Sequence, residues 1–135
     1  MKTAKIEYTG ELRNTATHLR SGQTIITDAP PDNNGMGEAF SPTDLLATSL
    51  GCCMLTIMGI VAERHKLDIR GAKADVTKIM AASPRRVAEI IVEFVLPSKN
   101  LSANEKLLLE NAARTCPVAL SLHPDLKQTI HFHWS

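Results

Sequence analysis

The chain has 135 residues, enough for one domain that buries most of its core without metals or disulfides. Its 15 Lys and Arg nearly balance its 14 Asp and Glu, and no basic stripe is present, which argues against a nucleic-acid partner. The single Trp and single Tyr leave few rings on which bases could stack.

The N-terminal segment and the cysteines favour a cytoplasmic protein. Residues 1–7 contain no apolar stretch of the kind found in a signal peptide. Three cysteines, two of them adjacent, make a poor disulfide framework for a secreted protein. We therefore expect a reducing, cytoplasmic environment.

The first third of the chain is predicted to contain short strands and a loop. Residues 6–8 and 24–27 are β-like runs, and turn signals stand at Gly10 and at residues 21–22. Residues 28–37 hold two prolines and two glycines, a composition that predicts an irregular loop.

A long helix is predicted to begin after Ser41 and to run to about Lys66, a length of roughly 37 Å. Ser41 is a favourable N-cap, Pro42 suits the first helical position, and Asp44 follows the cap by three residues. Residues 45–62 are uncharged and just long enough to raise the question of a membrane span. The small and hydroxyl residues among them, and the lack of a second such stretch, favour a soluble core helix covered by a partner chain.

Two strands, at residues 72–81 and 87–96, are predicted to follow, joined by a turn at 83–86. Alternation in the second strand places its apolar residues on one face and Glu89 and Glu93 on the other. The apolar residues of this face are Ala88, Ile90, Val92, Phe94 and Leu96.

A second capping box, at Ser102, predicts a helix that extends to about Arg114. Residues 116–117 begin a shorter helix, and residues 129–134 form a final strand. Strands, long helix, strand pair, helices and final strand follow in this order, which favours an α+β fold over a doubly wound sheet.

The three cysteines are the main candidates for chemistry. Cys52 and Cys53 are neighbours on a helix, so their side chains point about 100° apart and cannot share a face. For each of them the alternative to a chemical role is that of a small apolar residue in the core. Cys116 lies near a helix N-cap, where free N–H groups and the helix dipole should favour the thiolate, but such a position is also a common structural one.

Two other classes of site have weaker support. His131 and His133 would share a strand face, but no second pair of ligands accompanies them, and adjacent cysteines lack the spacing of a zinc site. A cysteine hydrolase would need a histidine near its nucleophile, and no local signature selects among the remaining ones. These are His18, His65 and His123.

Several motifs together resemble the OsmC/Ohr family of thiol peroxidases, most closely its OsmC-like branch. They are residues 40–47 (FSPTDLLA), 49–53 (SLGCC), 62–64 (AER) and 116–118 (CPV). The similarity extends to the opening strand, the loop at 28–30 and the terminal strand, and it covers nearly the whole chain.

The resemblance implies a single OsmC-like domain over residues 1–135. It implies an α+β fold with antiparallel sheets around a long buried central helix. It also implies an intertwined homodimer in which the two long helices lie back to back, with one redox site per chain at the dimer interface.

The same resemblance implies the site residues and the reaction. Cys53 takes the place of the peroxidatic cysteine, Cys116 that of the resolving cysteine, and Arg13 that of the family arginine, with Arg20 as the alternative. The implied substrates are hydroperoxides, organic ones above all, and an external dithiol of unknown identity would reduce the resulting disulfide. We expect no cofactor, no metal, no nucleic acid and no membrane, and a role in antioxidant stress response.

One position departs from the family pattern. Peroxidases of this family carry a glutamate near the start of the long helix that holds the arginine, and Thr43 stands there in this chain. Asp44 is adjacent but is predicted to point to the opposite side of the helix from Cys53. An alternative function therefore stays open, that of a non-peroxidase OsmC-like protein that binds a small molecule or senses redox state.

Overall fold

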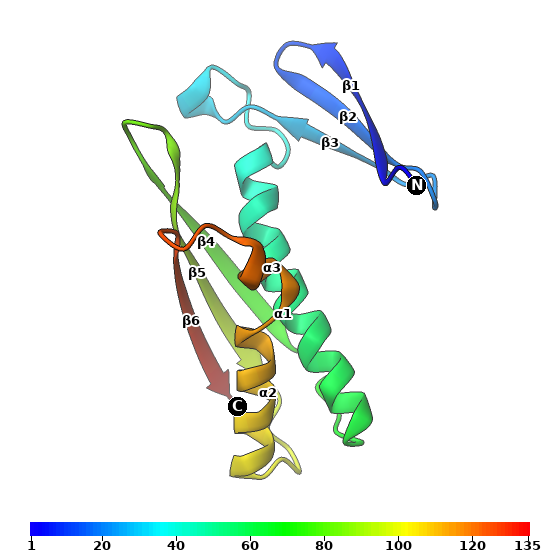
Figure 1. Cartoon of the computed structure of the whole chain (residues 1–135), viewed down its shortest axis with the longest axis vertical. Coiled ribbons are helices and arrows are strands. Elements are labelled where there is room, and N and C mark those ends of the chain that lie inside the picture. The colour runs from blue at the N-terminus through cyan, green and yellow to red at the C-terminus, as the bar shows by residue number, and fades with distance from the viewer. The chain divides into compact units, whose positions relative to one another are not determined.

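A computed structural model describes all residues from 1 to 135 (Figure 1). Six strands, three α-helices and one short 3₁₀ helix follow one another in the α+β order expected from the sequence. The chain divides into two compact units, residues 1–46 and residues 47–135.

The first unit contains an antiparallel sheet of three strands in the order β1-β2-β3. These are β1 (Ala4–Gly10), β2 (Arg13–His18) and β3 (Thr24–Asp28). Glu11 and Leu12 connect β1 to β2 with φ values of 55° and 64°, the left-handed pair of a tight hairpin turn. The strand β2 was absent from the sequence prediction, because its residues show no apolar alternation.

The predicted loop folds back onto the end of β3. It contains the 3₁₀ helix η1 (Pro31–Asn33), and the N–H of Asp28 donates to the carbonyl of Phe40 at 3.0 Å. A Cβ added at Gly35 would lie 1.8 Å from the carbonyl oxygen of Ala29, so only glycine fits where the loop passes this close to Ala29. The loop thereby encloses the end of β3.

The long helix α1 (Pro42–Arg64) begins as predicted. The hydroxyl of Ser41 accepts from the N–H of Asp44 at 3.0 Å, and the carboxylate of Asp44 accepts from the N–H of Ser41 at 2.9 Å. This reciprocal pair is a capping box. The helix ends two residues earlier than expected, because Lys66 adopts a φ of 56° and Leu67 donates back to Ala62 at 2.8 Å.

The second unit holds a sheet in the order β4-β5-β6. The pair β4 (Lys73–Ala81) and β5 (Arg86–Leu96) is antiparallel, whereas β6 (Lys127–Trp134) runs parallel to β5. This sheet is therefore mixed, not antiparallel as expected. The parallel pair is possible because α2 (Ala103–Arg114) and α3 (Pro117–Ser121) carry the chain back along the sheet.

The apolar face of β5 is confirmed from Ile90 to Leu96, with one correction at its start. A register shift between Ile79 and Met80 pairs Met80 with Val87, so Val87 and not Ala88 is buried. The predicted capping box of α2 is present, since the side chain of Ser102 accepts from the N–H of Glu105 at 3.1 Å.

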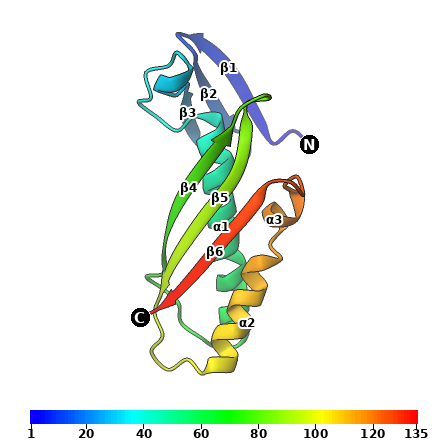
Figure 2. The ribbon, with the colours of Figure 1, turned by 90° about the vertical axis from the view of Figure 1, so that its left-hand side faces the viewer.

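The core of the second unit lies between this sheet and the helices α1 and α2, which both stand on one side of it (Figure 2). One stripe of α1 is buried there, and a Cβ at Gly51 would meet Val76 at 3.1 Å, so glycine lets α1 approach β4 closely. By length and composition alone α1 could cross a membrane, a test that core helices of soluble proteins also pass. Its buried stripe comprises Ala47, Leu50, Gly51, Met54, Met58 and Ala62.

Candidate redox site

Cys53 lies in the middle of α1 beside the buried stripe. Its side chain is half-buried and packs against the core, whereas Cys52 is exposed on the neighbouring face. The predicted divergence of these two side chains is therefore confirmed. All three cysteines of the chain are free thiols.

Cys116 lies at the junction of α2 and α3, where it is the N-cap of α3. Pro117 fills the first helical position, as predicted, and the N–H of Ala119 donates to Sγ of Cys116 at 3.4 Å. The residue has no exposed surface. The backbone therefore fixes this thiol inside the core.

The fold brings Cys53 and Cys116 together. Cys53 packs against the core cluster that contains Cys116, although the two residues stand on separate helices, and it is close enough to act on the pKa of the Cys116 thiol. Burial raises the pKa of Cys116, the N–H of Ala119 opposes this, and the neighbouring Cys53 raises the pKa further. Of the two interpretations left open for Cys116, a favoured thiolate and a structural cap, the raised pKa supports the second, because burial outweighs the effect of the short helix.

Arg13 forms an ion pair inside the first unit. It begins β2 directly opposite Asp28, the last residue of β3, and its Nη2 lies 2.9 Å from Oδ2 of Asp28. Glu38 is a second, longer neighbour, with 3.9 Å between its Oε2 and Nη2 of Arg13. Arg20, the alternative, is exposed in the turn after β2.

Asp28 is the partner of Arg13, and sequence reasoning did not identify it. Its side chain is 1% exposed, and Oδ2 accepts from both Arg13 and the N–H of Glu38, at 2.9 and 3.1 Å. Oδ1 is buried and accepts no hydrogen bond. The hydrogen bond from Arg13, followed by that from the Glu38 backbone, lowers the pKa of Asp28. An Asp in a Pro-rich loop offered no signal, since its partner depends on the register of β2 and β3.

Thr43, at the family glutamate position, and its neighbour Asp44 both make hydrogen bonds at the start of α1. The hydroxyls of Thr43 and Ser41 are 3.2 Å apart, and Asp44 completes the capping box. Cys53 and Cys116 thus meet within residues 47–135, whereas the Arg13–Asp28 pair lies within residues 1–46.

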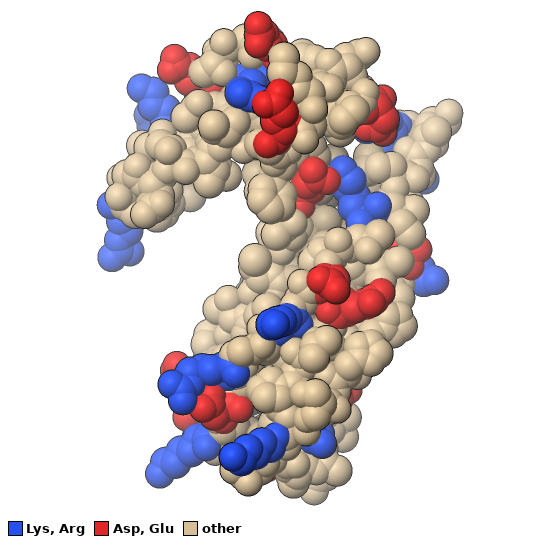
Figure 3. Space-filling view, turned by 180° about the vertical axis from the view of Figure 1, so that it is seen from behind, with Lys and Arg blue, Asp and Glu red and all other residues tan.

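The histidines and the charged residues form no comparable cluster. No group of three or more His, Cys, Asp or Glu side chains is placed to hold a metal ion. His131 and His133 are both exposed on β6, and His123 lies 3.8 Å from Asp125. Figure 3 shows one face of the molecule, on which basic and acidic side chains are interspersed and form no large patch of one sign.

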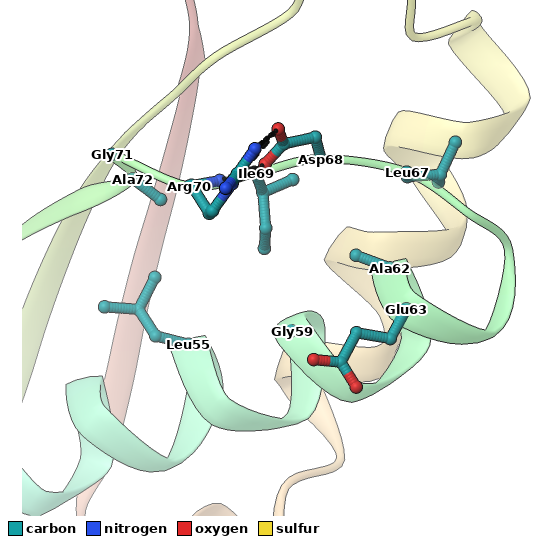
Figure 4. A pocket seen from close by; sticks show the side chains of 10 residues that line it. All are labelled: Leu55, Gly59, Ala62, Glu63, Leu67, Asp68, Ile69, Arg70, Gly71 and Ala72. Carbon is teal, nitrogen blue, oxygen red and sulfur yellow. Dashed lines mark hydrogen bonds and ion pairs between the residues drawn. The ribbon is translucent and has the colours of Figure 1, made fainter.

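A cavity of about 560 Å³ lies between the second half of α1 and the connection to β4 (Figure 4). Leu55, Gly59 and Ile69 line it, and the ion pair between Asp68 and Arg70, 2.8 Å long, stands at its wall. Neither Cys53 nor Cys116 lines this cavity, so it is distinct from the thiol pair.

The sequence and the fold match one family of known proteins. The family model for OsmC-like proteins matches residues 35–131, and the chain belongs to this family. No curated protein matches the chain.

Solved structures agree with this assignment. A Psychrobacter arcticus 273-4 protein, provisionally named an osmotic stress induced and detoxification response protein, is 53% identical, with a TM-score of 0.94 over 98% of this chain and 96% of its own. An organic hydroperoxide resistance protein OsmC from Legionella pneumophila is 16% identical, with a TM-score of 0.76 over 98% of each chain. An OsmC-like protein from Mycoplasma pneumoniae is 20% identical, with a TM-score of 0.77 over 100% of this chain and 96% of its own.

Proposed function

We propose that this protein is a thiol peroxidase that reduces hydroperoxides, organic ones above all. The observation that carries the proposal is the proximity of a half-buried thiol, Cys53, to a fully buried one, Cys116, in the same core. Membership of the OsmC-like family supports it, as does the name of the Legionella pneumophila protein of the same fold.

The reaction proceeds in two steps on the protein. The thiolate of Cys53 attacks one oxygen of the O–O bond, which leaves Cys53 as a sulfenic acid and releases the other oxygen as an alcohol after it takes up a proton. The thiol of Cys116 then attacks the sulfenic sulfur, a disulfide forms, and the hydroxyl leaves as water. An external dithiol, oxidised in turn to its own disulfide, restores both thiols.

The unequal surroundings of the two sulfurs suit these roles. Because burial raises the pKa of Cys116, this residue stays a neutral thiol at neutral pH and does not compete for peroxide. Once Cys53 is oxidised, Cys116 is a near neighbour in the same core.

Arg13 is the proposed electrophilic partner in the first step. A thiol with an ordinary pKa of about 8.5 is already a few per cent ionised at neutral pH, so full ionisation gains only about ten- to thirtyfold in rate. Fast peroxide reduction also needs stabilisation of the charge that develops on the leaving oxygen, which a fixed guanidinium supplies.

The rival function is a non-peroxidase OsmC-like protein that binds a small molecule or senses redox state, and Thr43 in place of the glutamate favours it. Steady-state consumption of cumene hydroperoxide with a dithiol reductant separates the two. We expect turnover well above that of the dithiol alone, loss of turnover in Cys53→Ser, and unchanged turnover in the matched control Cys52→Ser. Turnover no faster than the free dithiol would favour the rival.

Two further proposals concern the setting of the reaction. We place the protein in the cytoplasm, because a reducing compartment supplies the dithiol that the cycle needs. We also propose a homodimer, for which the exposed apolar side chains of the sheet β1-β2-β3 are the support.

A further inference from the structure

We infer that Asp28 is the positioning residue for Arg13, and that it takes over the task of the glutamate that Thr43 replaces. The inference rests on the proposed function for the chemical role of Arg13. Its structural basis lies wholly within residues 1–46.

The pair is built into the register of the sheet. Arg13 and Asp28 are direct cross-strand partners in β2 and β3, so their side chains leave the sheet on the same face. Nη2 of Arg13 donates to Oδ2 of Asp28 at 2.9 Å, the length of a strong charge-assisted hydrogen bond. This hydrogen bond fixes the side chain of Arg13, at the first residue of β2, to the neighbouring strand β3 of the same sheet.

The carboxylate is held in place from several sides. The N–H of Glu38 donates to the same Oδ2 at 3.1 Å, and the N–H of Asp28 itself donates to Phe40 at 3.0 Å. The side chain of Asp28 is 1% exposed, whereas that of Arg13 is 35% exposed. A buried, fixed anion therefore holds one end of a guanidinium whose remaining N–H groups stay accessible.

The buried Oδ1 of Asp28 strengthens this assignment. It accepts no hydrogen bond, and a carboxylate oxygen without a partner in a dry environment is costly. A buried ion pair is weak evidence for a stabilising role, since well-packed apolar residues often stabilise a core equally well.

Glu38 provides a matched control. Its carboxylate also faces Arg13, but the side chain is 63% exposed and 3.9 Å away, and its contribution to the site is made by its backbone N–H. Glu38→Gln removes the same charge as Asp28→Asn and leaves that N–H in place.

The test combines peroxide kinetics with the state of the guanidinium. We expect Asp28→Asn to slow the reaction of Cys53 with cumene hydroperoxide by about ten- to a hundredfold, and Glu38→Gln by no more than about twofold. The rate of Cys53 alkylation by iodoacetamide reports an intact site and should stay near the wild-type value in both. In an Arg13→Ala background, Asp28→Asn should cause no further slowing, which a merely structural role would not predict.

A second readout does not depend on turnover. In ¹⁵N-edited NMR spectra, restricted rotation should separate the Nη signals of Arg13 in the wild type and in Glu38→Gln, and Asp28→Asn should merge them. A fixed guanidinium in a protein without peroxidase activity would contradict the proposed function but support this inference. A freely rotating guanidinium in the wild type, or equal slowing by Asp28→Asn with and without Arg13, would overturn the inference.

Discussion

At the residue scale, the unequal exposure of two thiols determines what each can do. Cys116 is fully buried and its pKa is raised by that burial, so in the proposed reaction it reacts only with the oxidised Cys53. Cys53 is half-buried on α1, so part of this residue stays exposed to solvent. Exposure also distinguishes the two carboxylates near Arg13: that of Asp28 is buried and fixed, whereas that of Glu38 is largely solvated.

Arg13→Ala should impair peroxide reduction more than it changes the general reactivity of Cys53. Removal of one donor to a developing oxyanion costs on the order of a hundredfold in rate, whereas a change in thiolate population alone costs no more than about tenfold. Stopped-flow rates with cumene hydroperoxide and with iodoacetamide separate the two effects. Unchanged peroxide kinetics would reject the role of Arg13 and direct the search to Arg20.

The ion pair of Asp28 should appear in the pH dependence of stability. Because the hydrogen bond from Arg13 lowers the pKa of Asp28, the folded state holds the carboxylate charged more strongly than the unfolded chain does. Its contribution is therefore present above the ordinary value of 3.8 and is lost as the pH falls through the lowered pKa.

Denaturant unfolding of the wild type and of Asp28→Asn measures this contribution. The difference in free energy of unfolding should be constant from neutral pH down to about pH 5, and it should shrink as the pH falls below the ordinary aspartate value. A difference of the same size in strong acid would show that the charge of Asp28 does not contribute.

At the element scale, local signals predicted the helices better than the strands. The caps at Ser41 and Ser102 depend on only a few adjacent residues, and both predicted caps are present. By contrast, β2 has no apolar alternation, and the bulge that buries Val87 depends on a partner strand. The parallel direction of β6 is likewise set by the path of α2 and α3 and not by its own residues.

The candidate site shows the same division. The N-cap position of Cys116 could be predicted from Pro117, but the direction of its pKa shift could not, because that depends on how deeply the tertiary fold buries it. The nearness of Cys53 and Cys116 followed only from the family resemblance. The pairing of Asp28 with Arg13 could be predicted only if the register of β2 and β3 were known.

The hydrogen bonds at the start of α1, the helix that contains Cys53, should contribute measurably to stability. Ser41→Ala removes the hydroxyl that accepts from Asp44, and loss of such a cap costs about 1 kcal/mol of stability. Thr56→Ala is a suitable control, because its exposed hydroxyl only donates back to the carbonyl of Cys52 within the helix. Chemical denaturation should show a lower midpoint for Ser41→Ala and little change for the control, and equal midpoints would contradict the capping argument.

At the scale of the whole molecule, exposed apolar surface predicts a dimer. Cross-strand pairing places Ile6, Tyr8 and Ile25 on one face of the first sheet, and all three are more than half exposed. Contiguous apolar surface of this kind marks an interaction site, and a second copy of the chain is the partner that the family resemblance implies.

Light scattering on the purified, reduced protein measures the mass directly. We expect twice the mass of the chain at micromolar concentration. Substitution of Ile6 and Tyr8 by aspartate should shift this mass toward that of the monomer, whereas Lys5→Asp on the opposite face of β1 should not. A monomer in the wild type would contradict the prediction.

The most direct test of the thiol pair is disulfide mapping by mass spectrometry after treatment with a few equivalents of cumene hydroperoxide. We predict a bridge between Cys53 and Cys116, with Cys52 still open to alkylation. In Cys116→Ser the bridge should be absent, and Cys53 should carry added oxygen instead. Oxidation of Cys52 alone, or oxidation of Cys53 without a bridge in the wild type, would contradict the account.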